Sequence, residues 1–498
     1  MSNEINFSEF SRQSLKGVLI ISGKFLFQLL KGTWVVFLVF ISKASSIDLN
    51  YLIAFVIVLL FFVVIRSYLV YRNFKFKIDG DYFVLKNGII SKKNTAIAFD
   101  RIQNVNFSQN LIHQLINVYQ VDLETAGSDK TEISIKALSL SDAKALRQKI
   151  TSGRSIGNEE IVVEETEKEK PLLTIDVKSL LKVSISENHF QSLLLLIAFL
   201  FGFYQQVEDV FKNFIGEEIL KNYLSKGKDI LLGSFLLLII VLILLSIVAV
   251  ITSFIRVFLR HFNLSFSIKN EAFEIKQGLV NKKAIILKRD KVQHIKITTN
   301  PLKRMMGISY VVFKQAISGK VKKTDKQIKI VGCKEEHLDK IKTTLFSSFD
   351  FNDVLKEKPH WYFTYRIILR NFLFLAFFNT FHYFIFDGIN QIYLNLLLIP
   401  ILGLMIFKRV KKTFLKIADE LILVGGGMIE TSETYLELFK VQNVKMKQTI
   451  FQRRRKITDI ILQTASGKIK IPSITMERAN ELYNHILYKV ETSTKEWM

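Results

Sequence analysis

The sequence predicts an α+β membrane protein with three transmembrane helix pairs, each followed by a strand-rich unit that a C-terminal helix closes. Two observations predict this class. Nearly half of the 498 residues are hydrophobic (49%), and they gather in long apolar stretches; a spanning helix needs about 20 such residues. Between those stretches one residue pattern recurs three times, and a fixed interval marks a structural unit used repeatedly.

The recurring pattern is a glycine, a glutamine 15 residues later and an alanine 23 residues after that. A basic residue lies two before each glutamine. The copies are Gly88, Gln103 and Ala126; Gly278, Gln293 and Ala316; and Gly427, Gln442 and Ala465. We assign these residues structural roles: the glycine belongs in a hairpin turn, and the glutamine bridges to backbone groups where a strand bends. The alternative for the glutamine is contact with a ligand.

Three helix pairs are expected from the apolar stretches. They lie at 15–71, 176–259 and 360–408. The first stretch, Leu15–Ile41, is broken by lysines and is counted as a span because it completes a pair. Ile230–Ile255 is the clearest span.

The strand-rich units are expected at 72–152, 260–347 and 409–491, with a glutamate-rich linker at 153–175. In the first unit Phe74, Phe76 and Ile78 alternate with polar residues, which is the period of a half-buried strand. Each unit should end in a helix that closes its core. These helices are expected over Leu138–Ile150, Lys334–Leu345 and Thr475–Val490.

The net charge of +24 resides in the units and the residues just before them: residues 71–150, 256–345 and 408–491 carry +4, +14 and +7. Such charge favours an anionic partner, and the apolar stretches select a membrane over nucleic acid. Basic residues also flank the helix ends that face the units. By the positive-inside rule, all three units are expected in the cytoplasm, beneath a bacterial cytoplasmic membrane that the chain crosses several times.

Helix pairs followed by units that carry Ile102-Gln103-Asn104-Val105 and Val441-Gln442-Asn443-Val444 resemble the bacterial pleckstrin-homology (PH) type 2 membrane proteins. The three-copy arrangement is similar to that of the YdbT-like group. The second unit departs from the motif at His294. The resemblance implies that each unit is a PH-like, seven-stranded, partly open barrel plugged by its C-terminal helix. Fold alone does not fix function.

The candidate binding residues are basic. The densest run is Arg453, Arg454, Arg455 and Lys456, and Lys303 and Arg304 occupy the equivalent place in the second unit. One interpretation is contact with phospholipid head groups, at about 1 kcal/mol for each charge near an anionic leaflet. The other is that these residues only signal topology.

No catalytic constellation, cofactor motif or metal-ligand spacing stands out, and the single cysteine, Cys333, excludes a multi-cysteine site. We therefore expect no enzyme, no cofactor and no metal site.

The expected function is a non-catalytic, membrane-anchored scaffold whose PH-like units mediate protein interaction or assembly. Its expected partners are anionic phospholipids, a membrane or cytoplasmic protein of unknown identity and further copies of itself, but not nucleic acid. A use in envelope integrity is a hypothesis. The alternative is a transporter whose units gate the helices, although spans poor in Asp and Glu weigh against proton coupling. An enzyme ranks third.

Overall fold

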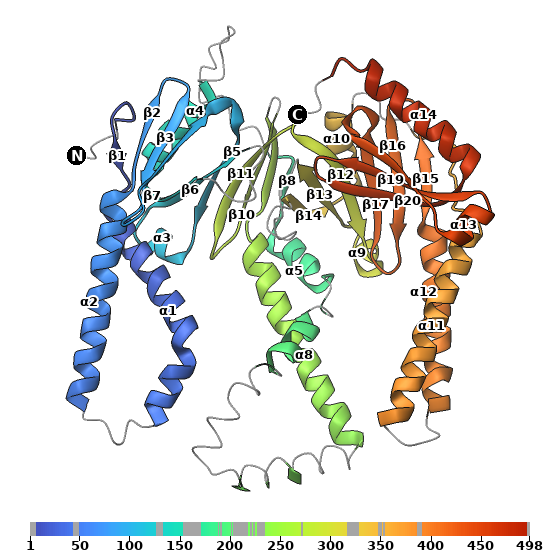
Figure 1. Cartoon of the computed structure of the whole chain (residues 1–498), viewed down its shortest axis with the longest axis horizontal. Helices are drawn as coiled ribbons and strands as arrows, with labels where there is room; N and C mark the ends of the chain where they lie inside the picture. The colour runs from blue at the N-terminus through green and yellow to red at the C-terminus, as the bar shows by residue number, and fades with distance from the viewer. Residues whose placement is uncertain are drawn as a thin grey trace.

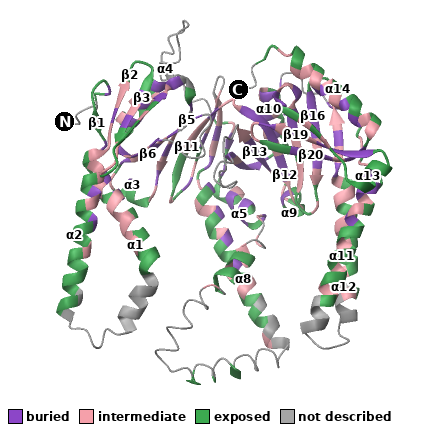
Figure 2. Ribbon diagram, in the orientation of Figure 1, coloured by how far each residue is buried: buried purple, intermediate pink, exposed green. Residues whose placement is uncertain are grey.

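The computed structural model describes residues 6–42, 49–125, 133–152, 171–187, 235–269, 272–315, 328–346, 354–385 and 391–495, with short pieces between them. Three strand-rich units lie side by side in a row, and the long helices extend from one side of that row (Figure 1). Buried residues gather inside the units, whereas the long helices are mostly exposed (Figure 2).

Within the described part of the chain, five helices exceed 20 residues. They are α1 (Gly17–Ser42), α2 (Leu49–Asn73), α8 (Phe235–His261), α11 (Tyr362–Ile385) and α12 (Gln391–Lys412). Two of them contain stretches long and apolar enough to cross a bilayer, Ile53–Asn73 and Ile243–His261. Of the first helix expected in the second pair, residues 192–200 and 202 are described, and they are helical. By length and hydropathy, two of the six expected spans are therefore supported in the described residues.

Each unit contains two antiparallel meanders of three strands and one C-terminal helix. The first unit has β2 (Lys75–Asp79), β3 (Tyr82–Asn87), β4 (Lys93–Ala98), β5 (Ile102–Gln109), β6 (Tyr119–Thr125), β7 (Ile133–Leu138) and α4 (Leu140–Ser152). The second has β9 (Ser265–Lys269), β10 (Ala272–Gln277), β11 (Lys282–Lys288), β12 (Val292–Thr299), β13 (Ser309–Gln315), β14 (Ile328–Cys333) and α10 (Glu335–Leu345). The third has β15 (Phe414–Ile417), β16 (Leu421–Gly427), β17 (Thr431–Glu437), β18 (Asn443–Lys447), β19 (Ile457–Thr464), β20 (Gly467–Thr475) and α14 (Met476–Thr492).

The expected seven-stranded barrel is wrong in its strand pairing, because in the described residues no unit closes on itself. The second meander of one unit pairs with the first meander of the next, through β5 with β11 and β12 with β17. The sheet orders are β1-β2-β3-β4, β7-β6-β5-β11-β10-β9-β8, β14-β13-β12-β17-β16-β15 and β18-β19-β20. The strand edges that would pair within one unit to close a barrel pair instead with strands of the neighbouring unit.

A short segment ahead of each unit covers the edge of its first strand. It is β1 (Ser11–Arg12) in the first unit, β8 (Leu173–Thr174) in the second and an isolated bridge at Glu357 in the third. The partners Phe76, Phe266 and Leu415 each lie 12 residues before the turn glycine. The first and third of these segments also reach the last strand, where Ser14 N–H donates to Ala137 O (2.8 Å) and His360 N–H donates to Ser473 O (2.7 Å).

The C-terminal helices lie where the sequence predicts them, and each covers the core of its own unit. Leu146 of α4, Ile341 of α10 and Leu482 of α14 are all buried. The core of the second unit continues into the third, since Phe346 stacks on Tyr435 with 6.2 Å between ring centroids. The sequence predicts a core for each unit but not how the units pack, and in the structure these two share a core.

Candidate membrane-contact surface

A five-residue helix follows the fourth strand of every unit. The three helices are α3 (Leu111–Leu115), α9 (Pro301–Met305) and α13 (Ile450–Arg454). Asn110, Asn300 and Thr449 are their N-caps, and each side chain accepts a hydrogen bond from the N–H of the third helical residue. Each cap lies seven residues after the motif glutamine, so the short helix belongs to the repeat.

The third residue of each short helix is polar and buried: His113 (2% exposed), Lys303 (2%) and Gln452 (1%). A buried polar group has to be hydrogen-bonded or paired, and each finds its own partner. The His113 ring lies 3.0 Å from Lys136 O, and Gln452 Nε2 donates to Asp459 Oδ1 at 3.1 Å. These side chains fasten the short helices to the units.

Lys303 is buried and paired with carboxylates, so its predicted contact with lipid is wrong. Its Nζ lies 3.3 Å from Glu430 of the third unit, 3.9 Å from Glu187 and 3.7 Å from the centre of the Tyr310 ring. Burial lowers the pKa of Lys303 from its ordinary value, and the two carboxylates oppose that change. The sequence contained a signal for this burial. The residue ten positions after the motif glutamine is polar in all three units, so it belongs to the repeat.

The outward face of the short helices is apolar and basic. Its large apolar side chains are Leu111 (55% exposed), Ile112 (38%), Leu115 (85%), Leu302 (46%), Met305 (84%), Ile450 (75%) and Phe451 (62%). The predicted basic residues Arg304, Arg453, Arg454, Arg455 and Lys456 are also exposed. We call these twelve residues the short-helix surface. Sequence reasoning found its charges and missed its apolar residues, because five residues are too few to show a helical period.

The chain leaves each short helix through a left-handed residue two positions beyond its last helical residue. These residues are Asn117 (φ 53°), Gly307 (φ 65°) and Lys456 (φ 52°). The predicted basic residue Lys456 therefore has a structural position as well as a charge. Asn and Gly adopt this conformation at low cost, whereas a lysine there is uncommon.

The short helices lie at the end of the units from which the long helices extend (Figure 1). In the first unit Lys16, just before α1, donates to Ile116 O at 2.9 Å. In the third unit the Arg455 guanidinium lies 5.1 Å from the Tyr362 ring, at the start of α11. The short-helix surface is thus level with the points where α1 and α11 begin.

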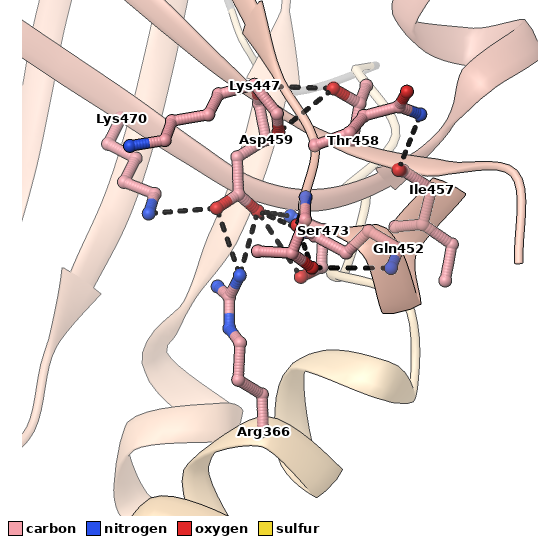
Figure 3. A network of polar contacts seen from close by, with 10 residues as sticks. Arg366, Lys447, Gln452, Ile457, Thr458, Asp459, Lys470 and Ser473 are labelled. Carbon is pink, nitrogen blue, oxygen red and sulfur yellow. Dashed lines mark hydrogen bonds and ion pairs between the residues drawn. The ribbon is translucent and has the colours of Figure 1, made fainter. Parts of the chain in front are cut away.

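A buried carboxylate ties α11 to the third unit (Figure 3). Asp459 of β19 accepts from Arg366 of α11 (3.0 Å), Lys470 (2.9 Å), the Ser473 N–H (2.8 Å) and Gln452 (3.1 Å). Burial raises the pKa of Asp459, but the hydrogen bonds from Lys470, Ser473 and Arg366 outweigh it and hold this pKa below its usual range.

The motif glycines occupy the same turn in all three units. Gly88, Gly278 and Gly427 have φ of 107°, 107° and 102°, and a Cβ on any of them would lie 2.0–2.1 Å from the carbonyl oxygen three residues ahead. Only glycine fits there without rearrangement.

The motif glutamines mark an irregular strand start. The register shifts at Gln103 in β5 and at Gln293 in β12, which is a β-bulge. Gln293 is buried, whereas Gln442 is exposed and its N–H donates to Gln463 O at 2.8 Å. The side chain of Gln103 lies outside the described residues, as do Ala126 and Ala316. Ala465 lies in the turn between β19 and β20.

Among the residues that the structure describes, no group of three His, Cys, Asp or Glu side chains could hold a metal ion. Cys333 is buried ahead of α10, and burial raises the pKa of its thiol to about 12. The described surface that recurs in all three units is therefore the apolar face of the short helices, and in the second and third units it has basic neighbours.

Comparison with known proteins gives two findings. A family profile described as "Bacterial PH domain" matches residues 26–154, 228–348 and 371–490. A relative from Bacillus subtilis (strain 168), named "UPF0699 transmembrane protein YdbT", is 22% identical over 420 residues, which cover 82% of this chain and 83% of the relative. Each profile match includes residues of a long helix ahead of its strands.

Proposed function

The chain belongs to the family of bacterial PH-domain proteins, and from that premise we propose that it is a non-catalytic scaffold anchored in the cytoplasmic membrane. Six spans in three pairs hold the three PH-like units on the cytoplasmic side. The units rest on anionic lipid and assemble with one another and with partner proteins.

The short-helix surface is the observation that carries this proposal. Single exposed apolar residues are common on soluble proteins, but a contiguous apolar patch rimmed by polar residues marks an interaction site. Met305 and Leu115, 84% and 85% exposed, belong to such a patch. Here the patch recurs in three units, lies level with the helix ends and has basic neighbours in the second and third units. Apolar side chains beside arginine suit the boundary between lipid head groups and acyl chains.

The energies are modest for each unit. Complete burial of one large apolar side chain contributes about 1.5–3 kcal/mol, and each basic residue near an anionic leaflet adds about 1 kcal/mol. A short helix that buries two such side chains only partly is a weak binder alone. The spans compensate, because a tethered unit meets the bilayer at a high effective concentration.

The transporter alternative has less support. Among the described residues, the long helices make their extensive contacts within pairs, α1 with α2 and α11 with α12. Asn379 and Asn395 exchange hydrogen bonds of 3.2 and 2.7 Å between α11 and α12, a pattern that holds helices together in lipid. A substrate path would need polar groups from several pairs to converge.

The proposal is tested by the lipid that accompanies the chain. Full-length protein is extracted from membranes into polymer nanodiscs, and the ratio of anionic to zwitterionic phospholipid is measured by mass spectrometry. We expect Arg304→Gln, Arg454→Gln and Arg455→Gln, combined, to lower this ratio. The matched control removes three exposed lysines outside the short helices: Lys144→Gln, Lys340→Gln and Lys468→Gln. An equal ratio in both variants would overturn the lipid contact.

A further inference from the structure

The two junctions between units use the same register. At the first, Ser108 of β5 lies opposite Lys283 of β11; at the second, Thr298 of β12 lies opposite Ser432 of β17. In both cases the first residue is five after the motif glutamine and the second is five after the turn glycine. The junction is thus a repeated interface, formed by the fourth strand of one unit and the third strand of the next.

A row of three units leaves one half of this interface uncovered at each end. In the described sheets β18 is the outer strand of the last unit, and β4 is the outer strand of the first. Asn443, Lys445 and Lys447 of β18 are exposed, whereas His294, the equivalent of Asn443 in the paired strand β12, is buried. Unpaired backbone groups along such an edge are a template for another strand.

A turn beside the third strand takes part in the first junction. In the second unit this turn is covered by the first, since Gln114 of α3 donates to Leu279 O (3.1 Å) and Val280 O (3.0 Å). In the first unit the residue equivalent to Val280 is Ile90, and it is 98% exposed. The residue equivalent to Gln114 in the last unit is Arg453 of α13, which is exposed as well.

We propose that the occupant of both edges is a second copy of this chain, with β18 of one copy paired to β4 of the next. The register of the internal junctions places Lys445 opposite Thr95, as Lys296 lies opposite Thr434 within the chain. It also brings Arg453 to the Ile89 and Ile90 carbonyls of the next copy. This inference rests on the proposed scaffold function and names its partner.

Such an interface is head-to-tail, so it produces a closed ring when its rotation closes and an open row when it does not. The long helices of a single copy extend from one side of the row (Figure 1). Repetition of the internal junction therefore keeps the helices of successive copies on that same side, as one membrane requires.

One predicted pair is unfavourable. Lys447 would lie opposite Lys93, and like charges directly opposite each other destabilise a sheet. The junction between copies is therefore weaker than the internal ones, and salt should strengthen it by screening this repulsion.

The test is cysteine cross-linking of the full chain in native membranes. Opposite residues of antiparallel strands lie about 4.5–5.5 Å apart at Cα, within the range that a disulfide spans. The test variant combines Lys445→Cys with Thr95→Cys. Its matched control combines Lys296→Cys with Thr434→Cys, the same residue types at the internal junction. The native Cys333 is buried and does not interfere.

On oxidation we expect the test variant to form a ladder of covalent multimers of the 57.7 kDa chain, with a higher yield in salt. The control should form only a link within one chain. A ladder absent from the test variant while the control links would overturn the proposal, and the edge lysines would then serve to keep β18 unpaired. Dimers from Lys445→Cys alone would also overturn it, since they indicate symmetric pairing of β18 with β18. The lipid ratio measured in nanodiscs does not depend on pairing between copies. The nanodisc experiment therefore tests lipid contact independently of the cross-linking experiment.

Discussion

Substitution of Asp459 by asparagine should loosen the attachment of α11 to the third unit. Asparagine keeps the shape of the side chain and has one carbonyl oxygen in place of two. In the native protein, Asp459 Oδ1 accepts hydrogen bonds from Ser473 and Gln452, whereas Oδ2 pairs with Arg366 and Lys470. The amide of Gln452 is 1% exposed and has no access to water. The asparagine oxygen will therefore stay with Ser473 and Gln452, and the two cations will lose their partner.

The expected cost follows from these contacts. A hydrogen bond to a charged group contributes about 1.5–3 kcal/mol. The Lys470 side chain is 53% exposed, so its pair with Asp459 is largely screened and adds little. Arg366 is 31% exposed and carries most of the loss. We expect a local free-energy loss of about 2–3 kcal/mol, or a roughly 30- to 150-fold fall in the protection of nearby amides.

The assay is hydrogen–deuterium exchange, read by mass spectrometry, of the full chain in nanodiscs. Asp459→Asn should speed exchange in β19 and in the first turn of α11. The matched control is Asp419→Asn, which removes a carboxylate of the same unit that lies 2.7 Å from Lys489 and is 78% exposed. Water screens an exposed pair of this kind, so the control should change exchange little. Equal exchange in β19 for the two variants would refute this account of Asp459.

Three further predictions concern other parts of the chain. Gly427→Ala should destabilise the third unit by about 1–3 kcal/mol because of its left-handed backbone, whereas Gly426→Ala, whose Cβ would meet nothing within 4 Å, should leave the melting temperature nearly unchanged. Burial lowers the pKa of His294 from 6.5 to about 3, with Lys314 and Lys296 adding to the effect. The unfolded state alone then takes up a proton as pH falls below 6.5, so by pH 5 this residue should cost about 2 kcal/mol. His294→Asn, the residue found at 104 and 443, should remove that part of the pH dependence of thermal unfolding; an unchanged dependence would contradict the assignment. Leu146→Asp buries an unpaired charge in the core of the first unit and should cost more than about 3 kcal/mol, read as faster proteolysis of that unit, whereas Lys144→Asp on the exposed side of α4 should not.

The sequence predicted the features that depend on local pattern. The glycine of each repeat marked a turn that only glycine fits, and Phe76, assigned to a strand by its alternation with polar residues, lies in the core. The C-terminal helices were predicted within two residues at most of their ends, because their amphipathic period extends over three or more turns.

Strand pairing between units could not be predicted from the sequence. A strand shows which of its faces is buried, but not which neighbour its edge will meet. Lys303 and Arg304 illustrate a second limit: adjacent lysine and arginine look equally exposed in a sequence, yet the N-cap at Asn300 directs the first inward and the second outward.

The depth of the short-helix surface tests the central claim most directly. Nitroxide labels on cysteines introduced singly at Leu115, Met305 and Phe451 report whether each site contacts lipid or water, because oxygen concentrates in the bilayer and a nickel chelate stays outside. A label at Lys468 is the control, since eight-residue β19 separates it from α13 by about 25 Å. For the full chain in anionic nanodiscs we predict that the three short-helix labels are accessible to oxygen and shielded from nickel, and that Lys468 shows the reverse. Nickel accessibility at all four sites would contradict the claim that the PH-like units rest on the membrane.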